Sequence, residues 1–204
     1  MFITLLGKED VMGKQLSEMS LEKLWHLFPI YLTEHKHYWN DWFYDEEKQL
    51  KQILSMSQIV RISHIGSTAI NSIRAKPIID ILVEIANDID FQYIKCILIA
   101  NEYICMVEDK DRMSFNKGYT PDGFAQKVFH LHFRRIGDND ELYFRDFLKS
   151  NPLVAQKYEK LKLDLWKQYE FNRDAYTESK TDYIKKYTQK ARVLYNGRYD
   201  YKEK

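Results

Sequence analysis

The stretch HIGSTAINSIRAKPIIDILVE, residues 64–84, decides the fold. The residues before it, 58–63, are rich in β-branched side chains and alternate roughly in polarity, which predicts a strand that ends at a tight turn on Gly66. Residues 78–85 form a nearly continuous apolar run, which predicts a second strand. Asp80 lies inside this run, and because a buried carboxylate requires a partner, the sequence predicts a polar site beside it.

The turn between the two strands carries residues that suit phosphate. Small hydroxyl residues favour a helix N-cap, where free backbone N–H groups bind phosphate, and the candidates are Gly66, Ser67 and Thr68. Lys76 adds a cation, and Asp80 offers an oxygen ligand to Mg²⁺. The alternative is an ordinary turn, with Asp80 paired to a structural cation such as Lys76 or Arg74.

A later segment, 127–135, predicts another strand with two histidines on one side. His130 and His132 alternate with apolar residues, so both imidazoles face the same way. They are candidates to bind a transition metal with Asp80, to act as a general base, or to bind phosphate when protonated. The alternative is a hydrogen-bonded packing role. His64, just before the turn, is a further candidate to join the two histidines, although a histidine at a strand end more often has a structural role.

The motifs HIGSTAI at 64–70 and AKPIIDILV at 75–83 resemble the signature of the GrpB family, a branch of the nucleotidyltransferase fold. Further matches follow in the family's order: NEY at 101–103, Arg112 with Phe115, HLHF at 130–133, FRDFLKSNP at 144–152, YEKLK at 158–162, and the region 176–183 with Lys180. The resemblance covers residues 38–193. It implies that Ser67 starts a helix, that Asp80 faces a cleft, and that Lys180 contacts phosphate.

The chain departs from the two-acid pattern of active nucleotidyltransferases, which carry a second acid two positions after the first. That position holds Leu82. Glu84 lies on the same strand face, but about 13 Å from Asp80, whereas paired metal ions stand about 3.5 to 4 Å apart. Glu84 therefore does not replace the second acid that is missing at position 82, and catalysis is in question.

The functional expectation is a nucleotidyltransferase-like protein that binds a nucleotide or phosphorylated small molecule with Mg²⁺ or Mn²⁺. If it is an enzyme, the reaction is transfer of a nucleotidyl group to a small acceptor. The catalytic candidates are Asp80, His130 and His132, and the metal ligands are Asp80 and His132. Two alternatives are a catalytically inactive ligand-binding protein, which the missing acid favours, and an interaction protein on the same fold.

The fold class that follows is α+β, with a mixed sheet of about five strands flanked by helices and with helices at the C-terminal end. Further strands are predicted at 103–107 and 112–117. Predicted helices cover 38–54, 88–100, 138–148, 153–170 and 176–195, after a short one that Ser20 caps. The predicted organisation is an N-terminal extension (1–37), the main domain (38–195) and a tail (196–204). Trp39, Trp42 and Phe43 are assigned to the core rather than to base stacking.

Three other features carry alternatives. Arg112 is a candidate for bidentate binding of phosphate, with a sheet-face ion pair equally open. Arg145 and Asp146 are expected to form an ion pair that locks their helix to the sheet. The turn-rich segment 118–123 is predicted to be a mobile loop over the cleft.

Composition limits the classes of partner. The net charge of +1 and the pI of about 7.7 give no general attraction to nucleic acid or anionic membranes. Cys96 and Cys105 have no metal-ligand spacing and are expected to be reduced core residues. The start of the chain lacks a signal-peptide pattern, and no apolar run is long enough to span a bilayer, so we expect a cytoplasmic protein.

Overall fold

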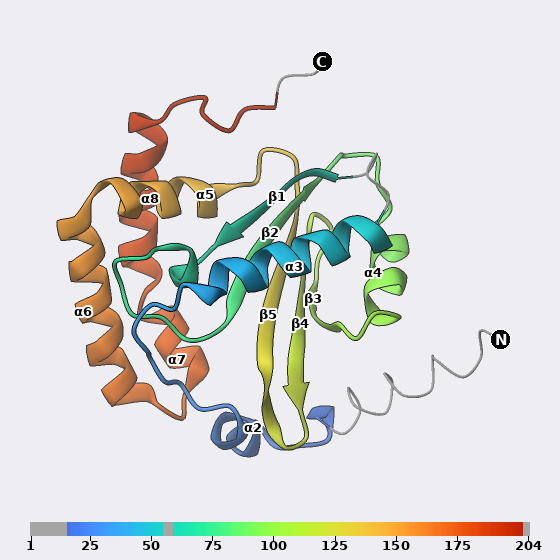
Figure 1. The fold of residues 1–204 in the computed structure, drawn as a ribbon, viewed down its shortest axis with the longest axis horizontal. Coiled ribbons are helices and arrows are strands. Elements are labelled where there is room, and N and C mark those ends of the chain that lie inside the picture. Colours follow the sequence, from blue (N-terminus) through green and yellow to red (C-terminus); the bar gives the residue numbers. More distant parts are fainter. Residues whose placement is uncertain (1–15, 55–58, 202–204) are drawn as a thin grey trace.

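The structure is a computed structural model that describes residues 16–54 and 59–201. A five-stranded sheet with the order β1-β2-β5-β4-β3 lies at its centre (Figure 1). The strands are β1 (Ile59–Ile65), β2 (Ile79–Ile85), β3 (Ile104–Glu108), β4 (Arg112–Thr120) and β5 (Gly123–Arg135). Only β2 and β5 pair in parallel, and the other neighbours are antiparallel. The predicted mixed sheet of about five strands is confirmed.

Helices cover both faces of this sheet. They are α2 (Leu21–Leu27), α3 (Tyr38–Ile53), α4 (Phe91–Ile99), α5 (Asp140–Ser150), α6 (Pro152–Tyr169), α7 (Arg173–Glu178) and α8 (Thr181–Leu194). Figure 1 shows α3 crossing in front of the sheet, while α5 to α8 gather on its β1 side. The predicted helices are present except that 176–195 is not one helix: the chain turns at Ser179 and Lys180 between α7 and α8.

The alternation of β2 divides the molecule into two sides. Ile79, Ile81, Val83 and Ile85 join the largest core with residues of α3 and α4, including the buried Trp39 and Phe43. This confirms that those two aromatics are core residues. The opposite face of β2 presents Asp80, Leu82 and Glu84, as the period of two requires. That second face, toward the C-terminal helices, carries the polar residues.

The segment predicted as a mobile loop, 118–123, is part of a β-hairpin. Tyr119 pairs with Phe124 and Thr120 with Gly123, so β4 and β5 continue to the turn. Phe28, which follows α2, packs against Tyr119 and Phe124 with ring centroids 4.7 and 5.0 Å apart. These contacts make the hairpin a packed element, and the prediction of a mobile loop was wrong.

The ends of the described chain also pack on the domain. Thr33 bridges to Ala75, and Tyr199 contacts both Arg61 and the ring of Tyr143. Cys96 is exposed on α4, contrary to the expected core position, because it lies on the outer face of that helix; Cys105 is half-buried, and both thiols are free. No helix within the described residues is long and apolar enough to cross a membrane.

Candidate metal and phosphate site

Asp80 meets both histidines of β5 because β2 and β5 are parallel neighbours. His130 is its register partner, and His132 pairs with Leu82. Oδ1 of Asp80 lies 3.2 Å from Nδ1 of His130 and 3.6 Å from Nε2 of His132. One ligand atom from each of the three residues falls within 4.8 Å of the others, a spacing that suits one metal ion. The structure therefore brings together the three residues that the sequence analysis named as catalytic candidates.

The protonation states suit metal binding. Burial raises the pKa of the Asp80 carboxyl, but hydrogen bonds from the two histidines outweigh burial and hold that pKa well below its usual range. Burial lowers the pKa of His130 to about 4, so its imidazole is neutral near pH 7. Nε2 of His130 lies 2.7 Å from the Tyr119 hydroxyl, which fixes the orientation of the ring. A carboxylate and a neutral imidazole are the forms in which these groups bind metal.

The turn at Gly66 places its backbone directly against Asp80. Gly66 has a φ of +67°, and a Cβ at this position would stand 2.9 Å from the Cβ of Asp80. Only glycine tolerates both the left-handed conformation and this approach. The helix expected to start at Ser67 is only a three-residue 3₁₀ turn, Ser67–Ala69, so it supplies no helix N-terminus for phosphate. Ser67 itself still lines the cavity beside Asp80.

Thr68 also lines the cavity beside Asp80, and its hydroxyl makes contacts within the fold, so its assignment as a phosphate ligand stays a prediction. Its hydroxyl is buried, donates to the carbonyl of Ile78 and contacts Nε2 of His64. The His64 ring stacks on Phe43, with centroids 5.0 Å apart. His64 thus packs on the core side of the sheet, away from the Asp80 centre.

A second metal-binding carboxylate has no room on β2. Leu82 is fully buried and packs with Ile65 and with Leu142 of α5. Glu84 is also fully buried, where it pairs with Arg61 at 2.7 Å and accepts from Asn139 at 2.9 Å. The acid that a two-metal site requires is replaced by apolar packing, and Glu84 serves as a structural ion pair.

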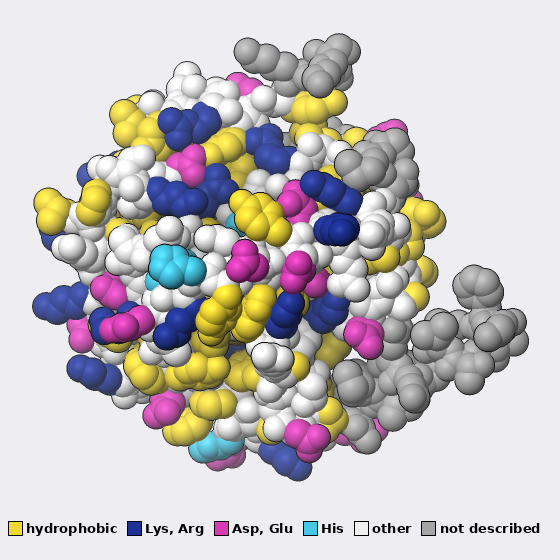
Figure 2. All heavy atoms as spheres, viewed as in Figure 1, with side chains coloured by type: hydrophobic (Ala, Val, Ile, Leu, Met, Phe, Trp, Pro, Cys, Tyr) yellow, Lys and Arg dark blue, Asp and Glu magenta, His cyan; other side chains and the backbone are white. Residues whose placement is uncertain are grey.

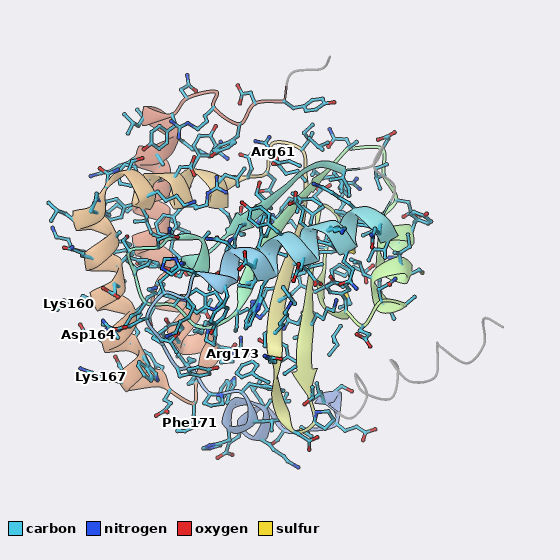
Figure 3. All side chains as sticks on the ribbon, viewed as in Figure 1. Arg61, Lys160, Asp164, Lys167, Phe171 and Arg173 are labelled. Atoms are coloured by element: carbon cyan, nitrogen blue, oxygen red, sulfur yellow. The ribbon has the colours of Figure 1, made fainter. Side chains whose placement is uncertain are left out.

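A cavity of about 620 Å³ opens over the Asp80 centre. Seven basic side chains line it together with the acids Asp80, Asp140 and Glu141, and four of the basic residues are Lys76 before β2, Lys162 on α6, Arg173 on α7 and Lys180 between α7 and α8. Figure 3 shows Arg173 between α7 and β5. We call these four residues the cation cluster. In the described part of the chain, none of the four forms an ion pair with a carboxylate.

Burial and neighbouring cations disfavour the charged forms of the three lysines in the cation cluster. Burial lowers the pKa of Lys162 to about 7 and that of Lys180 to about 8, and each lysine is further affected by a neighbouring cation. The pKa of Lys76 lies well below its ordinary value through burial and the charges of Arg173 and Lys180. Nζ of Lys162 donates to Oγ of Ser67 at 3.0 Å and to the carbonyl of Arg74. These contacts hold the ammonium at the cavity wall.

Two arginines considered from the sequence lie elsewhere. Arg112 forms a bidentate pair with Asp138, at 2.7 and 2.8 Å, on the exposed surface and outside the cavity, which is the ion-pair alternative; its role as a phosphate ligand stays a prediction. Arg74 pairs with Glu34 and Glu159 and not with Asp80. A third arginine, Arg145, does line the cavity; it pairs with Asp146 and donates to the carbonyl of His64 at 2.9 Å, which ties α5 to β1 as predicted.

Lys162 and Arg173 were not predicted as site residues. Lys162 falls on the buried face of α6 with Tyr158 and Leu165. A lysine on the apolar face of an amphipathic helix could have indicated a site residue, because a lysine side chain is rarely buried unless it has a partner. Arg173 has no such signal, since it stands at the first position of a short helix whose location is set by packing.

Fold and site together define an α+β protein in which a cation-lined cavity covers one carboxylate–imidazole centre. The pattern of the GrpB protein family matches residues 29–190, and the chain belongs to the GrpB family. It is 35% identical over 161 residues to glutamate-rich protein GrpB of Alkalihalophilus pseudofirmus, covering 76% of this chain and 91% of that protein.

Two further relatives agree. UPF0157 protein YqkA of Bacillus subtilis is 31% identical over 196 residues, which cover 87% of this chain. The match spans 52% of YqkA, about half its length. The crystal structure of the protein GrpB from Enterococcus faecalis superposes with a TM-score of 0.69 at 29% identity, covering 81% of this chain and 99% of that one.

Proposed function

We propose that this protein binds a nucleotide or another phosphorylated small molecule together with one divalent metal ion. The observation that carries the proposal is the cation cluster, which faces Asp80 without acidic partners of its own. Four cations gathered in one partly buried cavity repel one another, and a polyanionic ligand removes that repulsion. The cavity, at about 620 Å³, falls within the usual range for small-molecule sites of about 300 to 1,000 Å³.

The donor set favours Mn²⁺ over Mg²⁺ in this proposal. Asp80 supplies one oxygen, while His130 and His132 supply two imidazole nitrogens. Mg²⁺ strongly prefers oxygen ligands, whereas transition metals accept imidazole. A metal held there would neutralise and polarise a phosphate oxygen of the ligand. Leu82 and its apolar neighbours argue for one ion rather than two.

The test is titration calorimetry with tripolyphosphate and with nucleoside triphosphates, each with and without Mn²⁺. We expect binding that strengthens with Mn²⁺ and that falls about tenfold or more in Lys180→Gln and Lys162→Met. Lys160→Gln is the matched control, because Lys160 projects outward from α6, the helix that carries Lys162 (Figure 3). Absence of binding by the native protein to every phosphate compound would reject the proposal and favour an interaction protein.

Nucleotidyl transfer is a second candidate function. It is favoured by the position of the Asp80 centre, which lines the same cavity as the cation cluster and so adjoins the place expected for phosphate. The missing acid at position 82 opposes it. Release of pyrophosphate from a bound nucleoside triphosphate in the presence of Mn²⁺ and candidate acceptors would support transfer, and tight binding without release would favour a ligand-binding protein.

A further inference from the structure

A second cavity, of about 470 Å³, adjoins the charged one. Its walls include Tyr31, Tyr38, Trp42 and Phe124, and we call it the aromatic pocket. Lys76, Ile78 and Arg173 line both cavities, so the aromatic pocket and the charged cavity share a wall that includes two members of the cation cluster. A ligand that contacts Lys76 or Arg173 with its phosphates therefore has an adjoining space for the rest of the molecule.

Two tyrosines of this pocket are accessible, whereas Trp42 and Phe124 are partly buried and pack against neighbouring core clusters. Tyr31 is 38% exposed and Tyr38 is 46% exposed. Tyr38 and Trp42 lie one turn apart on α3, with ring centroids 4.8 Å apart. Figure 2 shows hydrophobic surface in the middle of this face, beside α3, with Lys and Arg side chains next to it. Exposed aromatic rings that line a cavity are suited to stacking against a flat group.

Two cations, Lys76 and Arg173, lie where the charged cavity meets the aromatic pocket. Nζ of Lys76 points over the Tyr176 ring at 5.4 Å, and the guanidinium of Arg173 lies 5.4 Å from the centroid of Tyr119. Both cations stand at the shared wall, where the ligand would pass from an anionic part to an aromatic part.

We infer that the aromatic pocket holds the heterocyclic base of a nucleoside phosphate whose phosphates lie in the charged cavity. This inference rests on the proposed function and narrows its ligand from phosphorylated small molecules in general to nucleotides. A sugar phosphate would leave the exposed rings uncovered. Stacking of a base on an aromatic side chain strengthens binding by about fivefold or more, so the aromatic pocket should contribute measurably to the affinity.

The experiment compares tripolyphosphate with nucleoside triphosphates on the native protein, Tyr38→Ala and Tyr31→Ala, all with Mn²⁺. Tyr44→Ala is the matched control, because Tyr44 is 62% exposed on the same helix as Tyr38 and lines neither cavity. We expect a nucleotide to bind at least fivefold more tightly than tripolyphosphate. We expect each pocket variant to lose most of that gain, while its affinity for tripolyphosphate stays unchanged and shows that the fold is intact.

Each other outcome has a distinct meaning. Equal affinity for tripolyphosphate and every nucleotide would overturn the assignment of the aromatic pocket and leave the proposed function standing. The same holds if a nucleotide gain survives in both pocket variants, since the base then lies elsewhere. Failure of both kinds of compound to bind would overturn the proposed function and this inference together.

Discussion

The backbone of Gly66 lies against the side chain of Asp80, so that a Cβ on Gly66 would overlap the carboxylate. Gly66→Ala is therefore expected to displace Asp80 from the two histidines and to weaken Mn²⁺ binding. The backbone conformation of Gly66, with φ +67° and ψ −170°, is nearly exclusive to glycine, so alanine there adds a cost of about 1 to 3 kcal/mol to folding. The measurements are urea unfolding and Mn²⁺ calorimetry.

A second glycine, Gly137, distinguishes the effect of backbone strain from the effect of a steric clash with Asp80. Gly137 also has a positive φ, +86°, but a Cβ there would meet nothing within 4 Å. Gly137→Ala should also lose stability, by about 1 to 2 kcal/mol, with unchanged Mn²⁺ affinity. Equal Mn²⁺ affinity in both variants would show that the approach of Gly66 to Asp80 has no role in the metal centre.

Asp80→Asn should abolish measurable Mn²⁺ binding, because the amide keeps the shape of the carboxylate and removes its charge. His132→Gln should weaken the binding by at least tenfold, since one of three ligand atoms is replaced by a poorer donor. Asp164→Asn, on the outer face of α6, is the control and should bind as the native protein does (Figure 3). Unchanged Mn²⁺ affinity in Asp80→Asn would remove the metal centre from consideration.

Lys162 predicts a pH dependence of stability. Its pKa is about 7 in the folded protein and near 10.5 in the unfolded chain, so the unfolded chain binds more protons between these values. The free energy of unfolding should therefore rise with pH across this window, and the contribution should be lost as pH falls toward 7. Lys162→Met should reduce this rise between pH 7 and pH 9 in urea unfolding. Parallel curves for the two proteins would contradict the lowered pKa.

Binding of a phosphate ligand should raise the lowered pKa of Lys162. A phosphate beside Lys162 favours the charged ammonium, so tripolyphosphate binding at pH 8 should take up protons. Calorimetry in two buffers with different ionisation enthalpies measures this uptake. The uptake should shrink in Lys162→Met and stay unchanged in Lys160→Gln.

Arg112→Gln distinguishes the two roles predicted for Arg112, which are phosphate binding and a surface ion pair. The guanidinium pairs with Asp138 on the surface, where such pairs contribute about 0 to 1 kcal/mol. We expect a loss of stability within that range and no change in affinity for tripolyphosphate. A tenfold loss of affinity would place Arg112 in the phosphate site.

The local sequence pattern was sufficient to predict most of the fold and the Asp80, His130 and His132 part of the site. The apolar run around Asp80 and the alternation of His130 and His132 are periodic signals, and strand geometry converts them directly into faces. The boundaries of β2 and α3 follow from the same periodicity. The conformation of turns was harder to predict from the sequence. The helix expected at Ser67 is one short 3₁₀ turn, and the segment 118–123, expected to be a mobile loop, belongs to a hairpin that packs against Phe28.

The sequence by itself determined that one strand carries a carboxylate, that another carries two histidines on one side, and that a glycine turn precedes them. Only the tertiary structure decided that β2 and β5 are parallel neighbours, which joins these groups into one centre. It also decided that Lys162 and Arg173 face that centre. The physical reason is that periodicity fixes which side of an element is buried, whereas the packing of whole elements fixes what that side meets.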